Sequence, residues 1–420
     1  MRFKYILSTL VSFEMIVVLF IFSGRIKALG AGAIFGVDLT LMFAVLVALI
    51  FAWSYFNGKL KIASPSKPVN VFAAFLLAYL IASISWSPVS EYGLRKMYFL
   101  GTLVPLAYMA GLMCGSDAKR LYRLLTALVL FCVLYLIAAI TVAGGWSALL
   151  QSDLITTVNF RSEDSISLYQ QNSNLTALAA TASLLIAYLL GSEFKARYVF
   201  IALAVLLALL SINLGGRAGI LRLLVAFFVF VTLVGNRPLV RAFCLTTAFV
   251  VTLLLVLQNT PYLLDLADKD YLPDGISRLI YTIAQNLYGG GEARVGLGIA
   301  AYNVWVDSPA LGSGLGGYPI AAGLGDVAAY PHNLFLELLS ETGLIGLAMF
   351  LSFFFLHVRL VLRPILRDSQ SYLNIAKLVI FCVSFSVVLF SSDITGREVP
   401  FFFGLIAASI VVGRFNSERA

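Results

Sequence analysis

Residues 124–143 read LLTALVLFCVLYLIAAITVA, a run of twenty residues that contains no charged side chain. A helix of about 20 apolar residues spans the roughly 30 Å hydrocarbon core of a bilayer. Comparable runs recur along the whole chain, in which 60% of the residues are hydrophobic, 12% are charged and the mean hydropathy is +0.95. The sequence therefore predicts an all-α, polytopic membrane protein, because a membrane β-barrel shows short alternating strands instead.

The apolar runs divide the chain into about twelve candidate transmembrane helices. They cover about 5–22, 37–56, 70–86, 97–114, 124–143, 174–191, 198–214, 218–235, 239–257, 333–356, 372–391 and 399–413. The first one resembles a signal sequence, but no convincing cleavage site follows it and Glu14 interrupts its apolar core, so we expect an uncleaved helix. One integrated domain is predicted, with nine spans in 1–257, a large loop with short helices in 258–332, and three spans in 333–420.

The basic residues are distributed unequally between the two predicted sides of the membrane. With a cytoplasmic N-terminus, 18 of the 29 lysine and arginine residues fall on the cytoplasmic side, as the positive-inside rule requires. Both termini are therefore expected in the cytoplasm, and the long segments at about 144–173 and 258–332 on the opposite face. The net charge of +8 fits attraction to anionic membrane lipids, and no clustered basic patch supports nucleic-acid binding.

Few side chains could carry metal or thiol chemistry. The four cysteines lie in or at the ends of apolar spans without paired spacing, which favours buried small side chains over a disulfide or a thiolate site. Only two histidines occur, His332 on the predicted outer face and His357 on the cytoplasmic side, and no acidic cluster accompanies either. We expect no metal and no other cofactor.

The second outer segment carries its own pattern of helices and turns. Apolar residues recur at helical spacing over about 276–287, three glycines interrupt them, and a second helix is predicted over about 295–306 before Asp307-Ser308-Pro309. The run LGSGLGGY follows at 311–318. Its glycines favour close backbone packing, with substrate contact as the alternative, because no preceding strand and no P-loop spacing support a phosphate cradle.

A short motif opens the next apolar span. His332 is followed by Asn333, nine residues, Gly343, two residues and Gly346. This spacing, together with the Asp-Ser-Pro and glycine-rich runs before it, resembles the O-antigen ligase and polymerase superfamily of Gram-negative envelopes. The resemblance also covers the stretch from Trp86 to Arg95 and is weaker before residue 160.

One segment departs from the family pattern. Before the sixth span the family is expected to show Asn-Pro-Asn, whereas this chain has Asn172-Ser173-Asn174, preceded by Gln171. A functional role for that turn is therefore not carried over.

The resemblance implies a GT-C-like glycosyltransferase of the inner membrane whose active site lies on the periplasmic face. It also implies a polysaccharide donor on undecaprenyl diphosphate and an acceptor hydroxyl on the lipid A core. Diphosphate leaves readily once its charge is neutralised, so the reaction needs cationic groups and a base for the hydroxyl. The sequence leaves the oligomeric state open.

Three residues are candidates for this chemistry. His332 would act as the catalytic base, because a histidine side chain has a reference pKa of about 6.5 and is partly neutral at envelope pH. Arg217 lies in Gly215-Gly216-Arg217-Ala218-Gly219 at the start of a span, where its planar guanidinium and the helix N-terminus would hold the diphosphate. The flanking glycines would let the anion approach the backbone. Arg294, at the start of the outer-segment helix, would be the second diphosphate ligand.

Further positions support this predicted site. Asn333 would either fix the histidine tautomer or cap the following helix. Glu337 and Glu341 lie four residues apart on one helical face and are expected to form structural ion pairs with Arg217 or Arg222. The remaining supporting candidates are Gly343, Gly346, Arg95, Asp393 and Arg397, of which the last two are charges that would face a cavity.

Two other functions remain open for such a chain. A repeat-unit polymerase would keep the chemistry and transfer to another carrier-linked glycan, so that only the product separates it from a ligase. A transporter of lipid-linked glycan would carry out no chemistry. Transporters commonly show internal repeats and broken helices, whereas no convincing duplication relates the two halves here. Direct displacement by a ligase predicts inversion at the anomeric carbon.

Overall fold

The computed structural model describes residues 3–29, 38–57, 67–88, 90–142, 168–191, 194–214, 216–234, 244–247, 260–268, 277, 280–281, 292–367, 371–388 and 393–408. Within these ranges the regular structure is helical and contains no strand. The all-α prediction is therefore confirmed for the described part of the chain. Most of the ninth predicted span, 239–257, and most of the outer segment at 144–173 lie outside these ranges.

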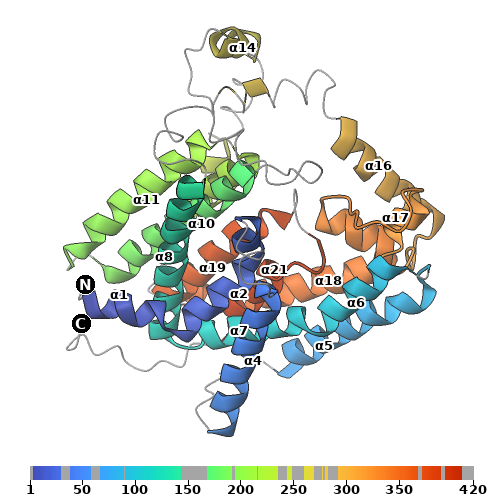
Figure 1. The fold of residues 1–420 in the computed structure, drawn as a ribbon, viewed down its shortest axis with the longest axis horizontal. Coiled ribbons are helices and arrows are strands. Elements are labelled where there is room, and N and C mark those ends of the chain that lie inside the picture. Colours follow the sequence, from blue (N-terminus) through green and yellow to red (C-terminus); the bar gives the residue numbers. More distant parts are fainter. Residues whose placement is uncertain are drawn as a thin grey trace.

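The helices follow one another in the order shown in Figure 1. They are α1 (Phe3–Leu10), α2 (Phe13–Ala28), α4 (Leu39–Phe56), α5 (Lys67–Ala82), the 3-10 helix η1 (Ser83–Trp86), α6 (Glu91–Gly101), α7 (Leu103–Gly115), α8 (Ala118–Val142), α10 (Leu168–Leu190), α11 (Ala196–Asn213), α12 (Arg217–Leu233), α14 (Thr260–Asp268), α16 (Glu292–Asp307), α17 (Tyr318–Ala321), α18 (Leu334–Arg367), α19 (Tyr372–Phe385) and α21 (Glu398–Ala407).

Seven helical segments in the described residues are long and apolar enough to cross a membrane. They are Leu39–Phe56, Pro68–Trp86, Glu91–Gly115, Ala118–Thr141, Asn172–Leu190, Ala196–Asn213 and Leu334–Arg367. Three shorter apolar helices, Ala218–Leu233, Tyr372–Phe385 and Glu398–Ala407, coincide with three further predicted spans. The apolar runs of the sequence therefore mark the helices of the fold, as expected for a membrane protein.

The first predicted span is two helices, so the prediction of a single helix over 5–22 is wrong. Helix α1 ends at Leu10, and Ser12 begins α2 by accepting a hydrogen bond from the backbone N–H of Met15 at 3.3 Å. A serine side chain at this position accepts a hydrogen bond from a backbone N–H group that has no partner within the helix. Glu14 stands in the first turn of α2 and is buried, where an acidic side chain favours a helix start.

The fourth predicted span also differs from its expected bounds. It starts earlier, at Glu91, and turns at Thr102 from α6 into α7. Pro105 lies three residues after the turn, and proline lacks the N–H that a continuous helix would use there. The earlier start brings the Trp86 to Arg95 stretch into the helical bundle.

Glycines allow α7 and α21 to pack in backbone contact. A Cβ atom at Gly111 of α7 would overlap with the carbonyl oxygen of Phe401, and one at Gly115 would overlap with that of Leu405. In the other direction, a Cβ at Gly404 would overlap with the carbonyl oxygen of Tyr108. Small residues spaced by four are typical of close helix contacts in membranes. This contact fixes α21, whose first residues belong to the candidate site.

Helix α10 packs against α8, α11, α12 and α19, and Figure 1 shows it beside α8 and α11. It begins at Leu168, so Gln171 to Asn174 belong to the helix. A turn before the helix was expected at these residues, and that expectation is wrong. Ser173 is fully buried, and its hydroxyl donates to the carbonyl oxygen of Ser211 at 2.9 Å. The departure from the family pattern therefore places a small polar residue in a tight helix contact.

Candidate functional site

His332 lies at the head of α18 in a left-handed backbone conformation. Its φ of 56° is the one positive value at a non-glycine residue in the part of the chain that the structure describes. This conformation costs energy for most residues and is concentrated at functional positions. The ring of His332 lies 4.4 Å from that of Tyr330, measured between centroids, and the side chain is half-buried. The imidazole is therefore held at a fixed place near the surface.

The spacing between Asn333 and Gly343 has a structural meaning. The Asn333 side chain accepts hydrogen bonds from the backbone N–H groups of Phe335 (2.9 Å) and Leu336 (3.2 Å), so it caps α18. Gly343 then interrupts the helix with φ 65° and ψ −166°, and a Cβ there would overlap with the carbonyl group of Ala310. The nine intervening residues form a short first arm of α18, bounded by a cap and a break.

The second glycine of the motif is explained by packing as well. A Cβ atom at Gly346 would overlap with the side chain of Thr342, whose hydroxyl donates to the carbonyl oxygen of Leu338 at 2.6 Å. The Tyr79 hydroxyl donates to the carbonyl oxygen of Thr342 at 3.0 Å. Gly343 and Gly346 are both buried. They shape the helix that carries His332.

The glycine-rich run 311–318 packs against neighbouring backbone. Gly314 N donates to the carbonyl oxygen of Glu341 at 2.8 Å, and a Cβ on Gly314 would overlap with Ser87. A Cβ on Gly316 would lie 2.5 Å from the Cα atom of Gly93. The predicted packing role is confirmed at these positions, because their backbone has no room for a ligand.

The loop that ends at His332 is fastened to the start of α6. The Asp326 carboxylate accepts hydrogen bonds from the backbone N–H groups of Glu91 (2.7 Å) and Tyr92 (3.2 Å). Helix N-terminal N–H groups have no partner within their own helix, and a negative charge is favoured there. An exposed loop is thereby held against the helical bundle.

Three charged side chains are buried together in the first arm of α18 and in α6. The Nζ atom of Lys96 lies 2.6 Å from Oε1 of Glu337 and 2.7 Å from Oε1 of Glu341. The exposed fractions of these side chains are 2%, 0% and 0%. The predicted partner Arg222 binds elsewhere, so that part of the prediction was wrong. We call this group the Lys96 cluster.

The turn before α21, residues 393–398, joins several helices. The Ile394 N–H donates to Oε2 of Glu337 at 3.0 Å, which connects the turn to α18. Arg397 donates to the carbonyl oxygen of Phe20 and to the Ser23 hydroxyl of α2, both at 2.7 Å. Glu398 accepts a hydrogen bond from Nη2 of Arg222 in α12. We call residues 393–398 the junction turn.

The junction turn contains two of the predicted supporting residues. Asp393 accepts hydrogen bonds from the backbone N–H and the hydroxyl of Thr395, both at 2.6 Å, and it lines a cavity. Arg397 contacts α2 and stacks over the Phe20 ring at 5.4 Å. Asp393 thus faces a cavity, as expected, whereas the contacts of Arg397 are with helix α2.

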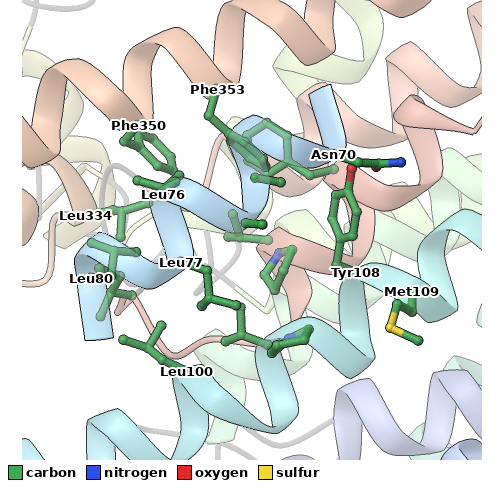
Figure 2. A pocket seen from close by; sticks show the side chains of 18 of the residues that line it. Asn70, Leu76, Leu77, Leu80, Leu100, Tyr108, Met109, Leu334, Phe350 and Phe353 are labelled. Carbon is green, nitrogen blue, oxygen red and sulfur yellow. The ribbon is translucent and has the colours of Figure 1, made fainter. Parts of the chain in front are cut away.

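The cavity beside Asp393 has a volume of about 250 Å³ and is mostly apolar. Figure 2 shows Leu80, Leu100 and Leu334 at one end and Asn70 and Tyr108 toward the other. Its walls come from α5, α6, α7, α18 and the region around α21. Because Leu334 directly follows the capping residue of α18, the cavity extends into the bundle from the head of that helix.

Arg217 is the first residue of α12, after Gly216 as N-cap. Its side chain lies outside the part of the chain that the structure describes. A Cβ atom at Gly219 would overlap with the Ser173 hydroxyl. That glycine therefore serves close packing of α12 on α10, which corrects the expectation that it opens the backbone to an anion.

Arg294 stands in the first turn of α16, and its side chain likewise lies outside the described part. Helix α16 packs against α17 and α18 (Figure 1). The hydroxyl of Tyr318 donates to the carbonyl oxygen of Leu297 at 3.0 Å, and burial raises the pKa of Tyr318, so that the phenol stays a donor. The helix that carries Arg294 is therefore packed on the helix that His332 precedes.

Arg95 and Lys96 are neighbours that face opposite ways. Arg95 is exposed, and its guanidinium lies 5.5 Å from the centre of the Phe99 ring. Lys96 points into the bundle and holds the two glutamates. The structure thus brings the lysine, and not the predicted arginine, to the head of α18.

Lys96, Glu398 and Asp326 were missed by the sequence reasoning. One signal for Lys96 was present, because two acids four residues apart in an apolar helix require a buried cation, and Lys96 is a basic residue at the edge of a predicted span. Asp326 gives no comparable signal, since its partners are backbone groups 234 and 235 residues away.

A family model described as O-antigen ligase matches residues 202–351 of this chain. The matched segment contains Arg217, Arg294, His332, Gly343 and Gly346, and it excludes Lys96 and the junction turn. No curated protein matches the chain.

Together, the helices and the site define an all-helical protein with several apolar helices of membrane-spanning length and a charged cluster at the head of one of them. The family match covers 150 of the 420 residues, and it supports the chain as a member of the O-antigen ligase family.

Proposed function

We propose that the protein is an O-antigen ligase that transfers a polysaccharide from undecaprenyl diphosphate to a sugar hydroxyl of the lipid A core. The observation that carries the proposal is His332. It lies inside the family match, adopts a strained backbone conformation, and stands at the capped head of α18. The proposal includes twelve transmembrane helices in a GT-C-like arrangement, cytoplasmic termini and a periplasmic site.

His332 acts as the base in the proposed reaction. Its imidazole takes the proton of the acceptor hydroxyl, and the oxygen forms a bond to the anomeric carbon of the donor. The attack comes from the face opposite the diphosphate, so the configuration at that carbon inverts. The half-buried position of His332 supports this role, because a membrane-anchored acceptor can reach it.

The bond between the anomeric carbon and the diphosphate oxygen breaks in the same step. Its electron pair leaves with undecaprenyl diphosphate, whose negative charge needs cationic partners. Arg217 and Arg294 fill this role in the proposal, since each stands in the first turn of its helix, where the helix dipole also favours an anion. No metal takes part in the proposed step.

The apolar cavity supports a substrate that carries a lipid. Cavities that bind ligands commonly measure about 300–1,000 Å³, so the 250 Å³ here suits a segment of a long chain and not the whole of it. The cavity begins near Leu334 and is lined by aliphatic and aromatic side chains. We assign it to a polyprenyl segment of the donor, with the rest of the chain in the bilayer.

Purified protein in lipid nanodiscs, given a defined carrier-linked polysaccharide and a lipid A core acceptor, tests the function. A ligase yields lipid A core that carries the polysaccharide through an inverted linkage, and chelation by EDTA leaves the rate unchanged. Longer carrier-linked glycan without modified core would identify a polymerase. Movement of the carrier across the bilayer without transfer would identify a transporter, and a retained linkage would contradict direct displacement.

A further inference from the structure

The junction turn contacts two helices of the candidate site: α12, which begins at Arg217, and α18, which His332 precedes. At one end, the N–H of Ile394 donates to Glu337 in the first arm of α18, which follows His332. At the other end, Glu398 binds Arg222, which lies five residues after Arg217 in α12. Four residues span less than about 15 Å even when extended, so this turn limits the separation of the two helices.

The contact on the α12 side is buried and directional. The Arg222 side chain is 1% exposed, whereas that of Glu398 is 25% exposed. Besides Glu398, Arg222 donates from Nη1 to the carbonyl oxygen of Asn174 in α10 at 3.0 Å. Two guanidinium N–H groups thus fix α12 to both α10 and the junction turn, with the planar geometry that arginine offers.

Glu398 also lies near a second guanidinium. Arg25 of α2 is half-buried, and its charge lies near those of Glu398 and Arg222. One carboxylate therefore lies near two cations, of which Arg222 is buried. Its removal would leave like charges facing each other, and α2 and α12 would be pushed apart.

We propose that Glu398 is a positioning residue that sets the spacing between the helix that begins at Arg217 and the helix that follows His332. This inference rests on the proposed function for its catalytic consequence. In the proposed reaction, Glu398 does not contact the substrate. A misplacement of about 1 Å between reacting groups can lower a rate by about 100-fold, so small changes at Glu398 should lower kcat more than they raise KM.

A double substitution separates positioning from stability. In Glu398→Met, Arg222 remains buried without its carboxylate, and the protein loses stability. In Arg222→Met with Glu398→Met, both charges are gone, and replacing a buried ion pair by apolar residues is often neutral for stability. The double variant should therefore melt near the wild-type temperature, while its kcat stays about 10- to 100-fold below wild type. Glu398→Asp, which keeps the charge, should recover part of the rate.

The Lys27 and Asp38 pair provides the matched control. It is also an ion pair near α2, at 2.6 Å, but its side chains are 35% and 56% exposed, and it joins α2 to the start of α4. Asp38→Asn keeps the acceptor that caps α4 and removes the charge. Its kcat and melting temperature should match those of the wild type.

The spacing itself is measured with spin labels at Leu224 of α12 and Leu344 of α18, two exposed positions, with the exposed Cys244 replaced by serine. Double electron–electron resonance should give a narrow distance distribution in the wild type and a shifted or broader one in the double variant. Wild-type kcat and spacing in the double variant would overturn the proposal. Absence of transfer by the wild type would instead contradict the proposed function, while the distances still decide whether Glu398 positions the helices.

Discussion

Replacing Lys96 by methionine removes the cation that holds Glu337 and Glu341 together in the bundle. The side chains keep a similar length and shape, so the main change is electrostatic. Two carboxylates then remain buried without the ammonium. Because both glutamates belong to the first arm of α18, the loss acts on the helix head that follows His332.

The size of the effect follows from the geometry. At an effective dielectric constant of about 20, unit charges 2.6 Å apart attract by roughly 6 kcal/mol before desolvation is counted. Removing one partner of a buried pair costs about 3–5 kcal/mol, because the other charge stays buried. Lys96→Met leaves two buried carboxylates without a cationic partner, so the free energy of unfolding should fall by at least about 3–5 kcal/mol.

Reversible unfolding by SDS in mixed micelles, followed by tryptophan fluorescence, measures this loss. Glu341→Gln is the matched control, since it leaves Lys96 and Glu337 as a neutral pair and should cost less free energy of unfolding than Lys96→Met. Adding Glu337→Gln and Glu341→Gln to Lys96→Met should restore most of the stability. Equal unfolding free energies for Lys96→Met and Glu341→Gln would refute the buried cluster.

Three further predictions concern packing, loop attachment and the cavity. Gly404→Ala should lower the melting temperature by several degrees, because its methyl group would overlap with the Tyr108 carbonyl. Gly24→Ala is the control in the same thermal melting experiment, and it should leave the melting temperature unchanged because the space around Gly24 is open. Asp326→Ala should lower kcat by releasing the loop before His332, and Asp326→Asn, which keeps one of the two acceptor oxygens, should restore part of the rate in a steady-state transfer assay. Ala74→Phe should fill the cavity and raise KM for a long polyprenyl donor while leaving KM for a short-chain donor unchanged; equal increases would contradict the assignment of the cavity.

The helical class and most helix positions could be predicted because apolar length is a local property of the sequence. The same runs do not show where a helix breaks. Ser12 and Thr102 interrupt stretches that read as continuous, because capping hydrogen bonds and a nearby proline outweigh uniform hydrophobicity. Gly343 was identified through a motif, but its role as a helix break depends on contact with Ala310, which spacing does not reveal.

The residues of the candidate site likewise fall into those that a local sequence signal identifies and those that only the packing reveals. His332 and Asn333 were found because their signals are local, a scarce histidine and an amide at a helix start. The partner of Glu337 was not, since Lys96 is 241 residues away and any buried cation would satisfy the pattern. Local composition thus indicates that a buried charge needs a partner, and only the packing of α6 against α18 decides which one.

The central claim is that the imidazole of His332 removes the proton of the acceptor hydroxyl. Asparagine tolerates the left-handed conformation that His332 adopts, so His332→Asn keeps the backbone at φ 56° while it removes the base. The most direct measurement is the single-turnover rate of transfer to lipid A core for wild type and His332→Asn, with melting temperature and donor binding measured on the same samples. The account predicts a correctly folded variant that binds donor and transfers at least about 100-fold more slowly, as loss of a general base requires. A His332→Asn variant that transfers at the wild-type rate would contradict it.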